Sequence, residues 1–188
     1  QDELYFSYQT NIWNGPSSQS VKVSTLDLDS FNSRLIFEHG IQSYTGTLYD
    51  IPDHKTAISA DGFAYVAAMF HVANGRNIFK VDLDTGNYEE IASLDFQVEG
   101  IVETPTGFAA IGVGHISYST GGEADNLHLQ FFDTLGRPIS EEYYFDTKAN
   151  NQLSIAKLAN DQVAVAFSDV WGQFVKINIF SEDGSELL

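Results

Sequence analysis

Apolar and polar residues alternate along much of the chain with a period of two. The alternation is clearest in residues 21–28, 77–83, 126–132 and 173–180. This period sends successive side chains to opposite faces of a strand, so it predicts half-buried β-strands. Convincing helical periodicity is absent. The best helical candidate, residues 148–158, is read equally well as a loop followed by a strand that begins near Leu153. The pattern predicts an all-β protein.

A turn signal follows each of these alternating segments, at residues 27–30, 82–86, 133–136 and 181–184. Glycine in the last three turns supplies the positive φ that a tight hairpin requires. Corresponding turns are spaced by about 55, 50 and 48 residues, which is the range of propeller blades and other repeat arrays. The spacing therefore predicts an internal repeat.

A second signal recurs in the same phase. Strands rich in small and β-branched residues follow a turn at residues 61–70, 106–114 and 160–167, and such strands suit the crowded inner part of a blade. Aligning both signals predicts four units of antiparallel strands, at residues 1–50, 51–95, 96–146 and 147–188. The first unit has no sequence for its innermost strand.

The segment from Gly107 and Phe108 to Gly136 combines a Gly-Phe strand, an alternating strand and a glycine turn. It resembles the generic blade of bacterial β-propellers with degenerate repeats, and the similarity covers most of residues 1–188. The resemblance implies one domain of about four propeller-type blades, either an open array or a segment of a larger propeller. It also implies a general tendency toward binding, although fold does not fix function. The alternative architecture is a pair of β-sandwiches of roughly 90 residues each.

The composition of the chain disfavours several classes of partner. Nine Lys and Arg residues face 26 Asp and Glu residues, and the formal charge of −17 disfavours nucleic acids and anionic membrane surfaces. The absence of cysteine excludes disulfides and thiolate metal sites. Apolar runs all fall short of the roughly 20 residues that a spanning helix needs, so membrane insertion is not expected. The start at Gln1 suits a mature chain after signal-peptide removal, or a trimmed one, and we expect an extracellular or periplasmic protein.

If the blade phase is right, the loops between the second and third strands of each unit emerge on one face. These loops contain aromatic residues beside polar ones, the combination that a sugar or peptide pocket requires. The predicted ligand-binding residues are Trp13, His71, Arg76, His115, Tyr118 and Trp171. Two alternatives remain open: the tryptophans cap the core at its rim, and the two histidines are unrelated loop residues rather than metal ligands or acid–base groups.

Other candidate chemistry is sparse. Acidic turns at residues 27–29, 82–84 and 182–183 offer oxygen ligands to calcium, but none matches a calcium-loop pattern, and ordinary hairpin turns explain them better. The pairs Glu89/Glu90 and Glu141/Glu142 are predicted to be adjacent in strands, where they point to opposite faces. No nucleophile elbow, phosphate loop, dinucleotide fingerprint or zinc-protease segment is present.

The sequence thus favours a non-catalytic binding module of an exported protein that engages a glycan, a peptide or a protein partner through its loop face. One alternative is a structural subunit or segment of a larger assembly, with another chain completing the first blade, because unpaired sheet edges invite pairing. Another is a polysaccharide hydrolase or lyase, for which Glu123 and Asp169 could supply separated carboxylates.

Overall fold

The computed structural model describes residues 3–12, 18–42, 54–70, 75–114, 126–148, 153–168 and 174–188. All regular structure in these residues is β. The first sheet contains β1 (Glu3–Ile12), β2 (Ser18–Asp27) and β3 (Ser33–Gln42), and the second contains β4 (His54–Ile58), β5 (Phe63–Phe70), β6 (Gly75–Asp82) and β7 (Tyr88–Ser93). The third contains β8 (Gln97–Thr104), β9 (Gly107–Val113), β10 (Asn126–Asp133) and β11 (Tyr143–Lys148), and the fourth contains β12 (Leu153–Lys157), β13 (Val163–Ser168) and β14 (Val175–Phe180).

Within each sheet, strands that are neighbours in sequence pair antiparallel. The third sheet extends past the expected boundary at residue 146, since β11 ends at Lys148. The prediction of an all-β chain is confirmed. Within the best helical candidate, β12 begins at Leu153, as the alternative interpretation of that segment expected. After β14 the chain returns to its own sheet only through an isolated bridge between Phe180 and Glu186. The described part of the chain contains no helix with the length and apolar character that crossing a bilayer requires.

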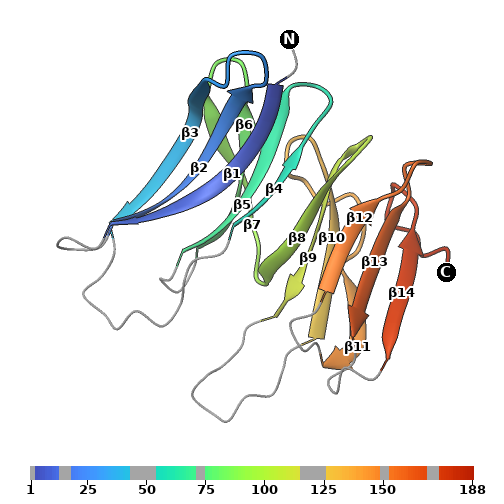
Figure 1. The fold of residues 1–188 in the computed structure, drawn as a ribbon. Coiled ribbons are helices and arrows are strands. Elements are labelled where there is room, and N and C mark those ends of the chain that lie inside the picture. Colours follow the sequence, from blue (N-terminus) through green and yellow to red (C-terminus); the bar gives the residue numbers. More distant parts are fainter. Residues whose placement is uncertain are drawn as a thin grey trace.

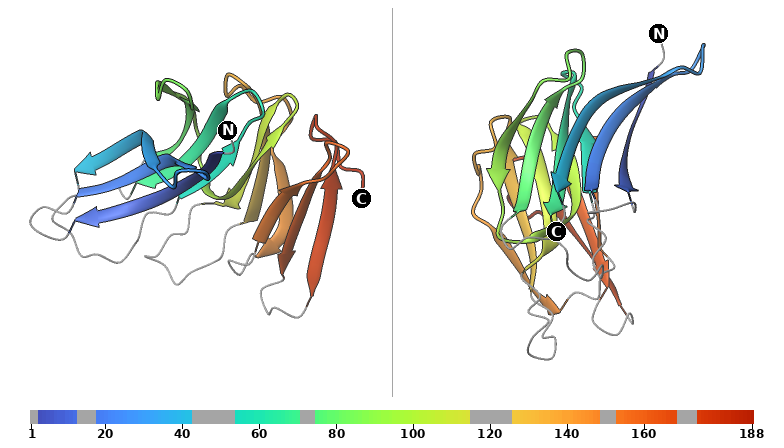
Figure 2. Two further views of the ribbon diagram at one scale, coloured as in Figure 1. Left: turned by 45° about the horizontal axis from the view of Figure 1, so that its top comes forward. Right: turned by 90° about the vertical axis from the view of Figure 1, so that its left-hand side faces the viewer.

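The four sheets stack face to face in chain order, from the first in blue to the fourth in orange and red (Figures 1 and 2). Three apolar cores lie between successive sheets. Val23 and Phe37 of the first sheet pack against Val66 and Phe79 of the second. The second core joins the second and third sheets, and the third core joins the third and fourth. In β5 and β9, the inner strands of the second and third sheets, alternate residues therefore enter two different cores, one on each face of the sheet.

β9 shows this double role most clearly, because all seven of its residues are buried. Phe108 faces the core shared with the second sheet, and Ile111 faces the core shared with the fourth. Its small residues are needed for close approach: a Cβ on Gly112 would overlap the carbonyl oxygen of Gln97 in β8. A strand buried on both faces explains why this segment is rich in small and β-branched residues.

The turns after β6, β10 and β14 pack against the preceding sheet through glycine. Gly86 has a φ of 74°, and a Cβ there would lie 2.5 Å from the carbonyl oxygen of Ile36 in β3. Gly136 repeats this contact with the carbonyl oxygen of Ile91 in β7, whereas a Cβ at Gly184 would meet the side chains of Ser140 and Phe131. In the first sheet Phe31 stands at the equivalent position, with a φ of 57° and 75% of its surface exposed. Glycine is thus required only where a sheet precedes.

Candidate functional site

Four strand pairs open toward the same edge of the stack. The C-terminal ends of β1, β5, β9 and β13, and the beginnings of the strands that follow them, lie along the lower edge in Figure 1. The predicted ligand residues come from the segments between these strands. Arg76 belongs to β6, where it pairs with Met69 of β5. The other predicted ligand residues lie outside the described residues: Trp13, His71, His115, Tyr118 and Trp171.

The opposite edge is formed by hairpin turns whose carboxylates bond to their own backbone. Oδ1 of Asp27 accepts hydrogen bonds from the N–H groups of Asp29 and Ser30 at 2.9 and 3.0 Å. Oδ1 of Asp82 accepts the equivalent pair from Asp84 and Thr85, and these backbone donors hold its pKa below the usual value. These bonds support the interpretation of the acidic residues as turn-forming groups.

A polar cluster lies where the third sheet meets the connection from the second. His128 of β10 stacks on Phe96 with ring centroids 5.3 Å apart, and its Nδ1 lies 2.5 Å from Oε1 of Glu142. Tyr144 of β11 donates its O–H to Oε2 of Glu142 at 2.8 Å, which raises the pKa of the phenol. Asp95 completes the cluster. The histidine ring is held by an aromatic face on one side and a carboxylate at its edge.

The chemistry of this cluster favours a histidine–carboxylate pair over a metal centre. One ligand atom from each of Asp95, His128 and Glu142 lies within 4.8 Å of the other two. Two ligands of a tetrahedral zinc ion at about 2.0–2.2 Å would be separated from each other by about 3.3 Å. The 2.5 Å separation of His128 and Glu142 is a hydrogen-bond distance instead. Metal binding would require that bond to break.

Sequence reasoning selected His71 and His115 and missed His128. The residue carried little signal, because a single histidine in an alternating strand looks like any half-buried polar position. The position of its partner, Glu142, was also predicted wrongly. The prediction that Glu141 and Glu142 lie in a strand is wrong, since β11 begins at Tyr143. Because Glu142 lies before the strand, its side chain is free of the strand's alternation, and its carboxylate bonds to His128.

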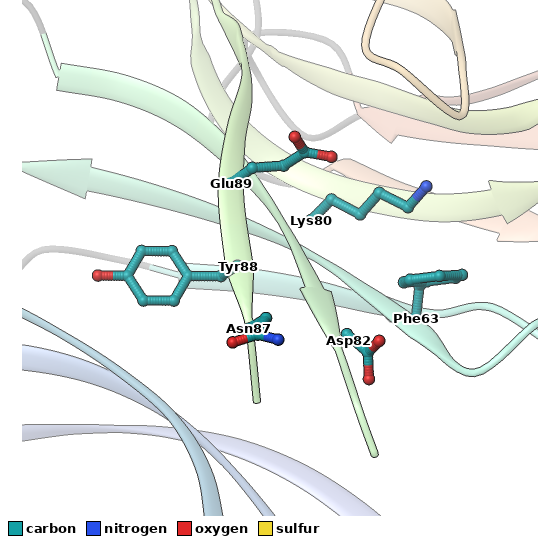
Figure 3. A pocket seen from close by; sticks show the side chains of 6 residues that line it. All are labelled: Phe63, Lys80, Asp82, Asn87, Tyr88 and Glu89. Atoms are coloured by element: carbon teal, nitrogen blue, oxygen red, sulfur yellow. The ribbon is translucent and has the colours of Figure 1, made fainter. Parts of the chain in front are cut away.

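A shallow pocket of about 360 Å³ lies over β5, β6 and β7 near the turn edge (Figure 3). Its lining residues are Phe63, Lys80, Asp82, Asn87, Tyr88 and Glu89. Lys80 is already engaged, because its Nζ donates to the carbonyl oxygen of Thr134 at 3.2 Å and sits 4.3 Å above the Phe63 ring. The cation links the second sheet to the turn of the third, which is a structural role.

The outward faces of the two end sheets are exposed and apolar. We call the outward face of the first sheet the first face. It carries the apolar residues Leu4, Phe6, Tyr8, Leu26 and Leu35, with Phe6 stacked on Tyr8 at 5.6 Å, and also Ser24 and the ion pair of Lys22 and Glu38. We call the outward face of the fourth sheet the last face; its described strand positions are Ser154, Ala156, Ala164, Ala166, Ser168, Val175, Ile177 and Ile179. None of those last-face positions is charged. Uncharged apolar surface of this kind is typical of the centre of an interface.

No protein-family model matches the chain, and a search of curated proteins finds no match either.

Proposed function

We propose that this chain is a non-catalytic binding module of propeller-type architecture, and that it binds a glycan or peptide at the edge where β1, β5, β9 and β13 end. The observation that carries the proposal is the repetition of this edge: the same pair of strands in each of the four sheets opens toward it (Figure 1). Long connections on one side of a rigid scaffold are where binding residues concentrate.

The arrangement of the strands supports the propeller-type part of the proposal. β8 lies beside both β4 and β12, and β1 lies beside β4, so the first described strands of successive sheets approach one another. The remaining strands of each sheet extend away from this line in chain order. Radial repetition of small antiparallel sheets around an inner set of strands is the plan of a propeller.

Elimination supports the choice of edge. The inner strands β5 and β9 of the second and third sheets face apolar cores on both sides. The shallow pocket over the second sheet has its cation engaged, because Lys80 binds the carbonyl oxygen of Thr134 and lies over the Phe63 ring. The carboxylates of the turn edge accept hydrogen bonds from their own backbone. Within the described residues, the histidine–carboxylate pair of His128 and Glu142 is closed by its own hydrogen bond. The remaining edge is the surface that all four sheets share.

The proposal is tested by binding of the purified chain to arrays of glycans and peptides, followed by titration of any hit. Trp13→Ala and Trp171→Ala should each weaken binding by about fivefold or more, since loss of a ring that stacks on the ligand costs about 1 kcal/mol or more. The matched control is Leu135→Ala, on the exposed turn after β10 at the opposite edge. Binding that survives loss of both tryptophans contradicts the proposal. Release of glycan fragments would favour the hydrolase or lyase alternative instead, whose carboxylates Glu123 and Asp169 lie outside the described residues.

A further inference from the structure

The last face contains a strand position whose equivalents in the other three sheets are completely buried. Counting back four positions from the turns at Asp27, Asp82, Asp133 and Ser181 gives the same site in β2, β6, β10 and β14, which faces the sheet that follows. Val23, Ile78 and Leu129 are each 0% exposed there, whereas Ile177 is 60% exposed. Two positions earlier, Leu127 is 0% exposed and its counterpart Val175 is 71% exposed.

The first face shows the same contrast in the opposite direction. Phe6 in β1 occupies the position of Val66 in β5, Ala110 in β9 and Val165 in β13, because each pairs with the residue three before its turn. The three counterparts are 0% exposed, but Phe6 is 38% exposed. Leu4 lies two residues before Phe6 on the same face and is 52% exposed. The residues at the same position in β5, β9 and β13 are 0% exposed. Each contrast marks a surface that a neighbouring sheet covers elsewhere in the chain.

The two end faces are the two halves of one repeated interface. Each internal core joins the follower-facing side of one sheet to the predecessor-facing side of the next. Among the described residues, no sheet covers the follower-facing side of the fourth sheet, which is the last face, or the predecessor-facing side of the first sheet, which is the first face. The two lie at opposite ends of the stack, so one copy does not bring them together (Figure 2).

We propose that a second copy of this chain docks its first face on the last face, giving a head-to-tail dimer with two such interfaces. Both halves of the interface are present on every copy, and they repeat packing that the chain already makes three times. A heterologous contact of this kind gives a closed ring when the rotation between successive copies adds up to a full turn. Two copies bring together eight sheets, within the typical range of propeller rings. This proposal is independent of ligand binding at the loop edge.

Charge favours the same pairing. The chain has a formal charge of −17, yet the last face has no charged residue among its described strand positions. On the first face Lys22 and Glu38 neutralise each other at 3.2 Å. The contact itself is therefore free of like-charge repulsion, and the repulsion between copies is long-range. Because salt screens long-range repulsion and leaves apolar burial intact, association should strengthen as NaCl is raised.

The test is light scattering coupled to size-exclusion chromatography over a range of protein and NaCl concentrations. We expect a dimer whose dissociation constant rises about 30-fold or more in Ile177→Asp and also in Phe6→Asp. Val175→Asp serves as a second variant of the last face, since 71% of this side chain is exposed and its replacement spares the core. Leu135→Asp is the matched control: it adds the same charge at a 56% exposed turn residue and should leave the dimer unchanged.

Mixing the two single-face variants tests the head-to-tail arrangement. A mixed pair of Ile177→Asp and Phe6→Asp retains one interface made of two intact faces, so mixing should restore dimer that neither variant forms alone. Circular dichroism of each variant checks that it is folded. A chain that stays monomeric at all concentrations overturns the proposal. A dimer that is lost in Ile177→Asp but kept in Phe6→Asp also overturns it, because that result indicates contact between two last faces.

Discussion

Replacing Leu129 and Ile177 by alanine, one at a time, measures what a covering sheet contributes at one repeat position. Leu129 is 0% exposed between the third and fourth sheets. Its truncation removes three carbons, about 2.4 kcal/mol of transfer free energy, and leaves a cavity, so we expect a loss of about 3–5 kcal/mol in the free energy of unfolding. Ile177 is 60% exposed, which leaves two fifths of its surface covered. Its truncation should cost about 1 kcal/mol.

The assay is urea unfolding followed by far-UV circular dichroism, together with thermal melting, at a protein concentration where the chain is monomeric. For 188 residues, each kcal/mol lowers Tm by about 2–4 °C, so Leu129→Ala should melt about 6–20 °C lower and Ile177→Ala about 2–4 °C lower. An unchanged dependence of the free energy on urea would show that the unfolded states are comparable. Equal losses for the two variants would refute the reasoning, because they would mean that Ile177 is covered within the monomer.

Three further outcomes follow from the turns. Gly86→Ala should lose at least about 2 kcal/mol in urea unfolding, because the new methyl group meets the carbonyl oxygen of Ile36 at a φ of 74°. Phe31→Gly should instead gain about 0.5–1 kcal/mol, because it relieves a φ of 57° at a residue that no preceding sheet contacts, and a loss would contradict this. The lowered pKa of Asp82 means that its carboxylate stabilises the fold above the unfolded-state pKa of about 3.9, and that this contribution disappears as pH falls through the lower folded-state value; Asp82→Asn should flatten that part of a Tm-against-pH curve.

The strands were predictable from the sequence because their signals are local. Alternation located the central residues of β2, β6, β10 and β14. The turn that begins at Asp82 marked the end of β6. The pairing order was predictable as well, since strands that follow one another in sequence usually pair side by side. The prediction was least accurate at β11, because Glu141 and Glu142 were expected in a strand that in fact begins at Tyr143. Proline at position 138 and the polar residues after it weaken the alternation there.

The contacts of His128 were not predictable, because they depend on long-range placement. Phe96 approaches the ring from the connection between two sheets, and Glu142 approaches from a segment that alternation assigned to a strand. None of these residues has a spacing in sequence that identifies the others. The pocket over Phe63 and Lys80 is similar, because the ammonium group is fixed by a carbonyl of the next sheet, at Thr134. Side-chain contacts between repeats depend on how the sheets stack, and a local sequence pattern does not determine this stacking.

The end faces explain why alternation alone left the extent of the array open. The sequence has the same apolar positions in all four units, because Ile177 is as apolar as Ile78 and Leu129, although only the latter two are covered. The turns carry the missing information. Where a sheet precedes, the turn residue of positive φ is a glycine against that sheet, as at Gly86. At Phe31 the same turn has an exposed ring, so a partner on the first face must leave more room at the turn edge than the internal sheets do. The turn of the first sheet therefore differs from the turn at Gly86, and a partner on the first face is held mainly by the apolar strand positions rather than by the turn.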